Sequence, residues 1–176
     1  NDYALQVNLA QGQPPVRHLG ILSVKNAGMN DSDVSTSGLQ SVNFSSTGWL
    51  SILENAATNF EPMVTSSQNA APIDAARLRF LTNPQDLNDG FQPTGDRYVF
   101  AARVTGSVNS AFEQPPEGAP LVSHKTASDE QGINVVLFAD TDILTDRLWM
   151  QKQNFLCQVV VNSFAYNSTL VVNLDD

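Results

Sequence analysis

Three aspartates that follow one apolar run form the best candidate for chemistry in this sequence. Asp140, Asp142 and Asp146 come directly after residues 133–139. If that run is a strand of an open α/β sheet, its carboxyl end lies where such folds usually bind ligands. Carboxylate oxygens there would suit a hard cation such as Mg²⁺ or Ca²⁺. The structural alternative, which we favour, is that Asp140 or Asp142 caps a helix. Asp146 would then form surface or interdomain ion pairs together with Arg147.

Aromatic side chains extend the list of residues that could contact a ligand. Trp49, Trp149, Tyr98 and Phe100 could stack against a sugar or a peptide, although aromatic residues on strands and amphipathic helices more often belong to the core. The candidate ligand-binding set is Asp140, Asp142, Asp146, Arg147 and Trp149. We predict no catalytic residue, no bound metal and no cofactor.

The possible nucleophile and bases lack the patterns that catalysis requires. Cys157 is the only cysteine, which excludes an internal disulfide and a cysteine-based zinc site. It lies late in an expected helix rather than on a strand-to-helix elbow, so we expect a buried hydrophobic residue. His18 and His124 are far apart, and no Gly-x-Ser-x-Gly motif accompanies them. We therefore expect both histidines to be surface residues.

A strand and a helix are the elements expected to position the aspartates. Residues 133–139 are almost continuously apolar, which is typical of a strand covered on both faces. Apolar residues then recur at spacings of four, seven and four: Leu144, Leu148, Phe155 and Val159. This spacing predicts a helix over residues 143–157. A strand followed by such a helix is half of a βαβ unit, so the sequence predicts an α/β fold, a mixed sheet with flanking helices.

The remaining pattern consists mainly of short strands and loops. Strands are expected at residues 3–9, 17–24, 41–44, 49–53, 60–65 and 97–105, the last of them central. Short helical turns are expected at residues 72–76 and 84–87. Residues 106–132 are rich in proline and polar residues and are expected to form a mobile loop.

Composition limits the classes of protein to which the chain can belong. Its 176 residues predict one soluble domain, residues 1–176. With 9 Lys and Arg against 18 Asp and Glu and no basic run, the chain is not expected to bind nucleic acid. No apolar stretch reaches the roughly 18–20 residues that span a bilayer, so membrane attachment would come from outside this chain. Because the first residues include neither Met nor a signal peptide, we expect a piece of a larger protein.

Three segments carry a resemblance to a known family. They are VVLFADTDILTDRLW at residues 135–149, followed by Gln153-Asn154-Phe155, then VSTSGLQSVN at residues 34–43 and FQPTGDRYV at residues 91–99. Their order and spacing resemble the uncharacterised ABC-type transport auxiliary family, which includes the GldG-type component of gliding-motility transporters. The resemblance extends from about residue 19 to residue 173.

The resemblance implies a cellular context that composition does not show. Members of this family have a large extracytoplasmic region that is held by flanking transmembrane helices and works with an ATPase and a permease. That region resembles the open flavodoxin and glutamine-amidotransferase type of α/β fold, and this chain would be its C-terminal part. The expected location is therefore the periplasmic, extracytoplasmic side of the inner membrane.

The function expected from the resemblance is that of a non-catalytic auxiliary or interaction module of an ABC-type transport system. Its partners would be the permease and ATPase subunits and a paired extracytoplasmic component. Two alternatives stay open: a domain that binds a small ligand, either a saccharide or a peptide, and a degenerate amidotransferase-like hydrolase.

Overall fold

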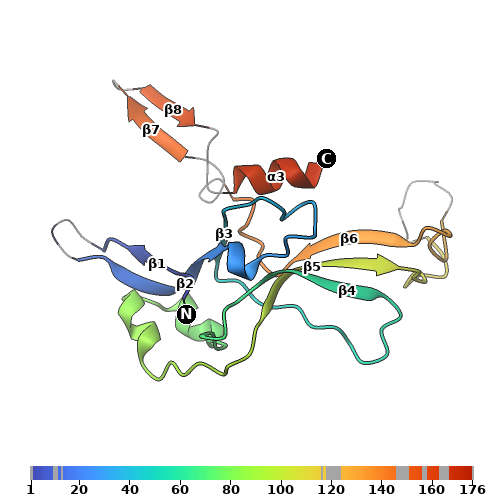
Figure 1. Ribbon diagram of the computed structural model, residues 1–176, viewed down its shortest axis with the longest axis horizontal. Helices are drawn as coiled ribbons and strands as arrows, with labels where there is room; N and C mark the ends of the chain where they lie inside the picture. Colours follow the sequence, from blue (N-terminus) through green and yellow to red (C-terminus); the bar gives the residue numbers. More distant parts are fainter. Residues whose placement is uncertain are drawn as a thin grey trace.

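The computed structural model describes residues 2–9, 12, 14–115, 117, 124–145, 151–155, 158–162 and 167–175. Its strands are β1 (Ala4–Val7), β2 (Val16–Lys25), β3 (Ser41–Ser45), β4 (Asn59–Thr65), β5 (Val99–Gly106), β6 (Ile133–Phe138), β7 (Gln151–Phe155) and β8 (Gln158–Asn162). They form two three-stranded sheets, ordered β1-β2-β3 and β4-β5-β6, and the hairpin β7-β8 (Figure 1). Every one of these strand pairs is antiparallel.

The first sheet is built on the ten-residue strand β2. Its apolar residues pair across the sheet with those of β3, and Leu22 lies opposite Phe44 while Val24 lies opposite Val42. All four side chains are at most 4% exposed. Burying such pairs on one face of an antiparallel sheet fixes the register, because a slip of one residue would turn them towards water.

The second sheet has β5 at its centre, as the sequence predicts. Ala101 of β5 lies opposite Phe138 of β6, and Ala102 lies opposite Leu137. Phe100, Ala101 and Ala102 are all buried, which agrees with a central strand.

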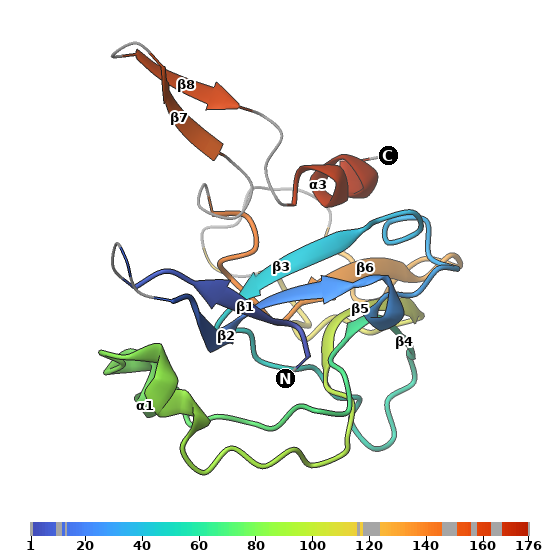
Figure 2. The same ribbon diagram turned by 60° about the vertical axis from the view of Figure 1, so that its left-hand side comes forward.

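The two sheets pack against each other around one core. A bridge between Met29 and Val64 links the segment that follows β2 to β4, and the N–H of Asn30 donates to the carbonyl of Met63 at 2.8 Å. The rings of Phe44 and Phe100 meet across the core with centroids 5.4 Å apart. In Figure 2, β2 and β3 pass in front of β5 and β6, and residues of both sheets contribute to the one core.

The described helices are short. They are η1 (Asn26–Gly28), α1 (Ala75–Arg79), η2 (Pro84–Asn88) and α3 (Ser168–Asp175). Helix α1 begins after Asp74, whose carboxylate accepts from the N–H of Ala76 at 2.8 Å, rather than at the expected Pro72. The turn predicted at residues 84–87 is confirmed by η2. Among the described residues, no helix is both long and apolar enough to cross a bilayer.

The predicted α/β fold, with its mixed sheet, flanking helices and flavodoxin-like or amidotransferase-like arrangement, is wrong. The strand expected at residues 133–139 is present as β6, but it is an antiparallel edge strand, and Val135 and Leu137 are each 41% exposed. The helix expected at residues 143–157 is also wrong, since Gln151–Phe155 and Gln158–Asn162 pair as β7 and β8. Short apolar spacings do not separate helix from strand by themselves, and the three consecutive valines at 159–161 favour extended backbone.

Two further expectations concern loops. The strand predicted at residues 49–53 is reduced to a single bridge between Leu50 and Val99. The segment 106–132 lies partly outside the described residues, and its described ends are joined by a bridge between Asn109 and Ala127. Its mobility stays a prediction.

Candidate functional site

Asp140 lies directly after β6 and connects the two sheets. Its side chain is buried, with 7% of the residue exposed. Oδ2 accepts a hydrogen bond from the backbone N–H of Ser45 at 2.7 Å, and Oδ1 accepts from the N–H of Asp142 at 2.8 Å. Both oxygens therefore bind backbone donors, one of them on β3. This geometry supports a structural role for Asp140, although the helix that it was expected to cap is not there.

The other members of the predicted aspartate cluster are only partly observed. Asp142 is half-buried, and its carbonyl accepts from both the hydroxyl and the N–H of Thr145, at 2.8 and 2.9 Å. Asp146, Arg147 and Trp149 lie outside the described residues. Within the part of the chain that the structure describes, no group of three or more His, Cys, Asp or Glu side chains could hold a metal ion.

Asn167 completes the contact to β3 in a way that sequence reasoning missed. Its side-chain oxygen accepts from the N–H of Asn43 at 2.8 Å, and its Nδ2 donates to the carbonyl of Asn43 at 2.9 Å. The residue is 1% exposed. Asn167 and Asp140 thus bind alternate residues along the free edge of β3. No local sequence pattern marks such a role, because the partner lies 124 residues away.

An ion pair between the buried Asp33 and the partly buried Arg103 holds the turn that follows η1 against β5. Nε of Arg103 donates to Oδ2 of Asp33 at 2.6 Å, and a second guanidinium nitrogen donates to Oδ1 at 2.9 Å. The guanidinium also binds Ser35 and Asn134. The hydrogen bond from Arg103 holds the pKa of Asp33 below its ordinary value, and the same bond raises the pKa of Arg103. Because the guanidinium of Arg103 already binds Asp33, Ser35 and Asn134, we interpret this cluster as structural.

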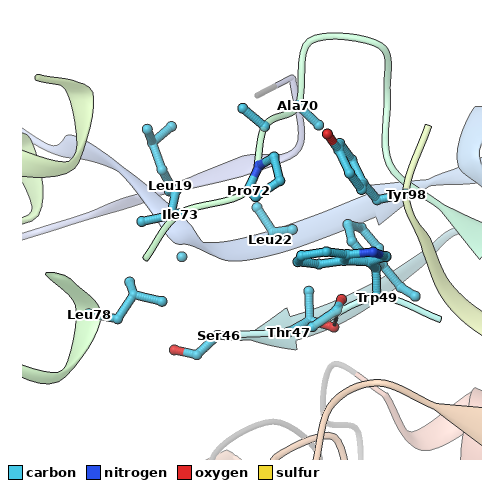
Figure 3. Close-up of a pocket in the computed structure, with 14 residues that line it drawn as sticks. Leu19, Leu22, Ser46, Thr47, Trp49, Ala70, Pro72, Ile73, Leu78 and Tyr98 are labelled. Atoms are coloured by element: carbon cyan, nitrogen blue, oxygen red, sulfur yellow. Dashed lines mark hydrogen bonds between the residues drawn. The ribbon is translucent and has the colours of Figure 1, made fainter. Parts of the chain in front are cut away.

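An apolar pocket lies where the first sheet meets β5, and its volume is about 90 Å³ (Figure 3). It is lined by Leu19, Gly20, Leu22, Ser46, Thr47, Gly48, Trp49, Ala70, Ala71, Pro72, Ile73, Leu78, Tyr98 and Phe100. None of these lining residues is charged. In Figure 3, Trp49 and Tyr98 lie on one side of the pocket and Leu78 on the opposite side. We call this the Trp49 pocket.

The Trp49 pocket unites three of the aromatic residues that the sequence offered for stacking. Trp49 is 54% exposed and meets Tyr98 edge to face, with centroids 5.6 Å apart. Phe100 is instead buried in the core. Trp49 was expected within a strand, so its position at an open pocket follows from tertiary structure and not from local pattern.

Glycine 20 shapes one wall of this pocket. A Cβ at that position would lie only 2.8 Å from Cδ2 of Leu78. Glycine therefore lets Leu78 of α1 approach the backbone of β2. The pocket is assembled from β2, the segment after β3, the segment before α1, and the start of β5.

The second sheet presents an apolar face on the side away from the core. Val136 and Phe138 of β6 pack against the core, while the alternate residues Val135 and Leu137 are each 41% exposed. The cross-strand register places the half-buried Phe60 and Val104 and the exposed Pro62 on the same face, around the fully buried Ala102. We call this surface the outer face. Exposed apolar surface of this kind often marks an interaction site.

Comparison with known proteins gives the context for these features. A family model described as "ABC-type uncharacterized transport system" matches residues 1–174. The chain belongs to this family. No curated protein and no solved structure matches it. The family resemblance in the sequence is thereby confirmed, and the chain is an auxiliary component of an ABC-type transport system.

Within the described residues, both histidines of this ABC transport auxiliary component make hydrogen bonds with backbone groups. Nδ1 of His18 accepts from the N–H of Gly20 at 3.1 Å, and burial lowers the pKa of His18. Nε2 of His124 pairs with the carbonyl of Phe112 at 2.7 Å. Cys157 lies outside the described residues.

Proposed function

We propose that this ABC transport auxiliary component is a non-catalytic interaction module that acts on the extracytoplasmic side. The outer face is the observation that carries the proposal. Covering Val135 and Leu137 would remove further apolar surface from water, worth roughly 1 kcal/mol for each side chain. The partner is another component of the same transport system, and it would present an apolar patch flanked by basic residues, because this chain has a net charge of −9.

Co-purification of the full transport system tests this proposal. Val135→Asp would place a carboxylate on the outer face and is expected to weaken association with the partner components at least tenfold. Val34→Asp is the matched control, because it adds the same charge at a residue that is 75% exposed elsewhere. Val34 follows Asp33, which pairs with Arg103, and Arg103 lies on the face of the second sheet that is opposite the outer face. If Val135→Asp assembles as well as the unaltered protein while remaining folded, the outer face is not the binding surface.

The extracytoplasmic placement, anchoring by helices outside this chain and the link to gliding motility are parts of the same proposal. Alkaline phosphatase fused to this domain in the full-length protein should be active if the domain lies outside the cytoplasm. Inactive phosphatase with an active cytoplasmic reporter at the same junction would contradict the placement.

A second candidate function is small-ligand binding, and the Trp49 pocket favours it. A half-exposed aromatic ring beside an apolar hollow is a common feature of ligand sites. The remaining alternative, a degenerate amidotransferase-like hydrolase, relied on an open α/β fold. The antiparallel sheets of the described chain give it no support.

A further inference from the structure

Trp49 is 54% exposed, but the backbone on both sides of it is held by hydrogen bonds and its ring packs edge to face against Tyr98. On either side of it, the N–H of Gly48 donates to Ala139 and the N–H of Leu50 donates to Val99, both at 2.8 Å. Tyr98, which contacts the indole, is itself anchored by its N–H to Ser66 Oγ at 2.8 Å. Because the backbone that carries both rings is already ordered, contact with a ligand would cost little further ordering of the chain.

The size of the Trp49 pocket limits what can enter it. Its volume of about 90 Å³ is below the roughly 150 Å³ of an engineered cavity that encloses benzene. A ligand would therefore insert one small group. The rest of the ligand would lie at the mouth, against the exposed part of Trp49.

The polarity of the lining determines the chemistry of the inserted group. No lining residue is charged, so an ionised group would be buried without a partner, which is costly. Of the four lining side chains that carry a hydrogen-bonding atom, Ser46, Thr47, Trp49 and Tyr98, two are already engaged. Thr47 donates to backbone carbonyls, including that of Ala139 at 3.2 Å, and the hydroxyl of Tyr98 pairs with that of Thr94 at 2.9 Å. A saccharide would find few free hydrogen-bond partners, whereas an apolar group needs none.

We propose that the Trp49 pocket binds an uncharged ligand by accepting the edge of one apolar ring, while the rest of that ring lies against Trp49 at the mouth. This inference rests on the second candidate function, small-ligand binding. The inserted apolar group can belong either to a free small molecule or to a side chain of a peptide.

Titration followed by nuclear magnetic resonance tests the proposal on the ¹⁵N-labelled chain. Benzyl alcohol is expected to give saturable shifts at the amides of Gly20 and Gly48 and at the indole N–H of Trp49. Benzoate and benzylammonium should bind at least tenfold more weakly, and methyl glucoside should not saturate. Comparing benzyl alcohol with N-acetylphenylalaninamide distinguishes a free ring from a peptide-borne ring, and saturable binding of either one supports the site.

Two variants and one control make the test specific. Trp49→Ala should weaken binding at least tenfold, while Phe112→Ala, which removes an aromatic ring that is 57% exposed elsewhere, should leave it unchanged. Ala71→Leu fills the pocket and leaves Trp49 in place, so it should abolish binding even if Trp49→Ala fails to fold. Shifts that do not saturate, that persist in Ala71→Leu, or that are stronger for methyl glucoside would overturn the proposal.

Failure of this inference is distinguishable from failure of the interaction function. Val135→Asp alters the outer face and should leave the titration unchanged. Ala71→Leu alters the Trp49 pocket and should leave partner association on the outer face unchanged.

Discussion

The side-chain amide of Asn167 binds both the N–H and the carbonyl of Asn43, at 2.8 and 2.9 Å. It offers the edge of β3 the same donor and acceptor that a neighbouring strand would offer. Asp140 accepts from the next outward N–H on that edge, that of Ser45. Two side chains therefore close an edge that would otherwise be open for pairing with another chain.

Replacing Asn167 with alanine should destabilise the fold markedly. Two buried backbone groups of Asn43 would lose their partners, and each unsatisfied group costs about 1–3 kcal/mol. We expect a total loss of roughly 2–4 kcal/mol in the free energy of unfolding, measured by urea denaturation. Asn173→Ala is the matched control, because Asn173 makes one longer bond, to the carbonyl of Ser35 at 3.3 Å. A loss below that of the control would mean that the amide is not needed to close the edge.

Asp140 should behave as a structural carboxylate. Asp140→Asn retains one acceptor oxygen but turns an amide donor towards one of two backbone donors, so a loss of roughly 1–3 kcal/mol is expected in the same assay. Because both carboxylate oxygens already accept backbone N–H groups, millimolar Mg²⁺ or Ca²⁺ should not raise the melting temperature. A saturable rise that Asp140→Asn abolishes would instead support the metal hypothesis.

The stabilising contribution of the Asp33–Arg103 pair to the free energy of unfolding should be lost at acidic pH. The pKa of Asp33 is lowered in the folded protein by the hydrogen bond from Arg103. The unfolded chain therefore binds the proton more readily, and the contribution is present above the ordinary aspartate pKa of about 3.9. It is lost as the pH falls through the lowered folded pKa. Asp33→Asn should flatten the dependence of stability on pH below about 4, which denaturation at several pH values will detect.

An exposed ion pair provides the contrast to the partly buried Asp33–Arg103 pair. Lys125 and Asp129 are 3.9 Å apart, and their side chains are 72% and 60% exposed. Lys125→Ala should change the free energy of unfolding by less than about 0.5 kcal/mol, whereas Arg103→Ala should cost several times more. Equal effects would contradict the inference that Arg103 stabilises the fold through its ion pair with the buried Asp33.

His18 should produce a second dependence on pH, near neutrality. Burial lowers its pKa in the folded protein, and Nδ1 must be unprotonated to accept from Gly20. The contribution is fully present above the unfolded histidine pKa of about 6.5 and is lost as the pH falls from there through the lowered folded value. Resonances of the His18 ring should titrate below about 6.5, and His18→Phe should remove the slope of stability between pH 5 and 7. A ring that titrates above 6.5 would contradict this prediction.

The sequence predicted several strands well, because their patterns are local. The alternating or continuous apolar runs of β2, β4, β5 and β6 are visible in the chain itself. The helix at residues 143–157 was predicted wrongly because four apolar residues happen to match helical spacing. The antiparallel order of the sheets depends on which strands meet in space, and no local pattern records that choice.

The candidate sites show the same division between local and distant information. The end of β6 was correctly identified as the place where Asp140 lies, but its partner Ser45 is 95 residues away, so its role could not be predicted. Trp49 was interpreted as a core residue on a strand. Its position at the mouth of the pocket is set by residues of β2, α1 and β5, which are distant in the sequence, and 54% of Trp49 stays exposed there.

The closure of β3 also has a consequence for the order of events during synthesis. The edge of this strand stays open until Asn167 has emerged, and Asn167 lies 124 residues after its partner. At a typical synthesis rate of 5–20 residues per second, this delay is roughly 6–25 s. Throughout that interval the nascent chain carries an unpaired strand edge that a chaperone or another nascent chain can bind. The safety of β3 from association with other chains thus depends on a residue that is synthesised 124 positions later.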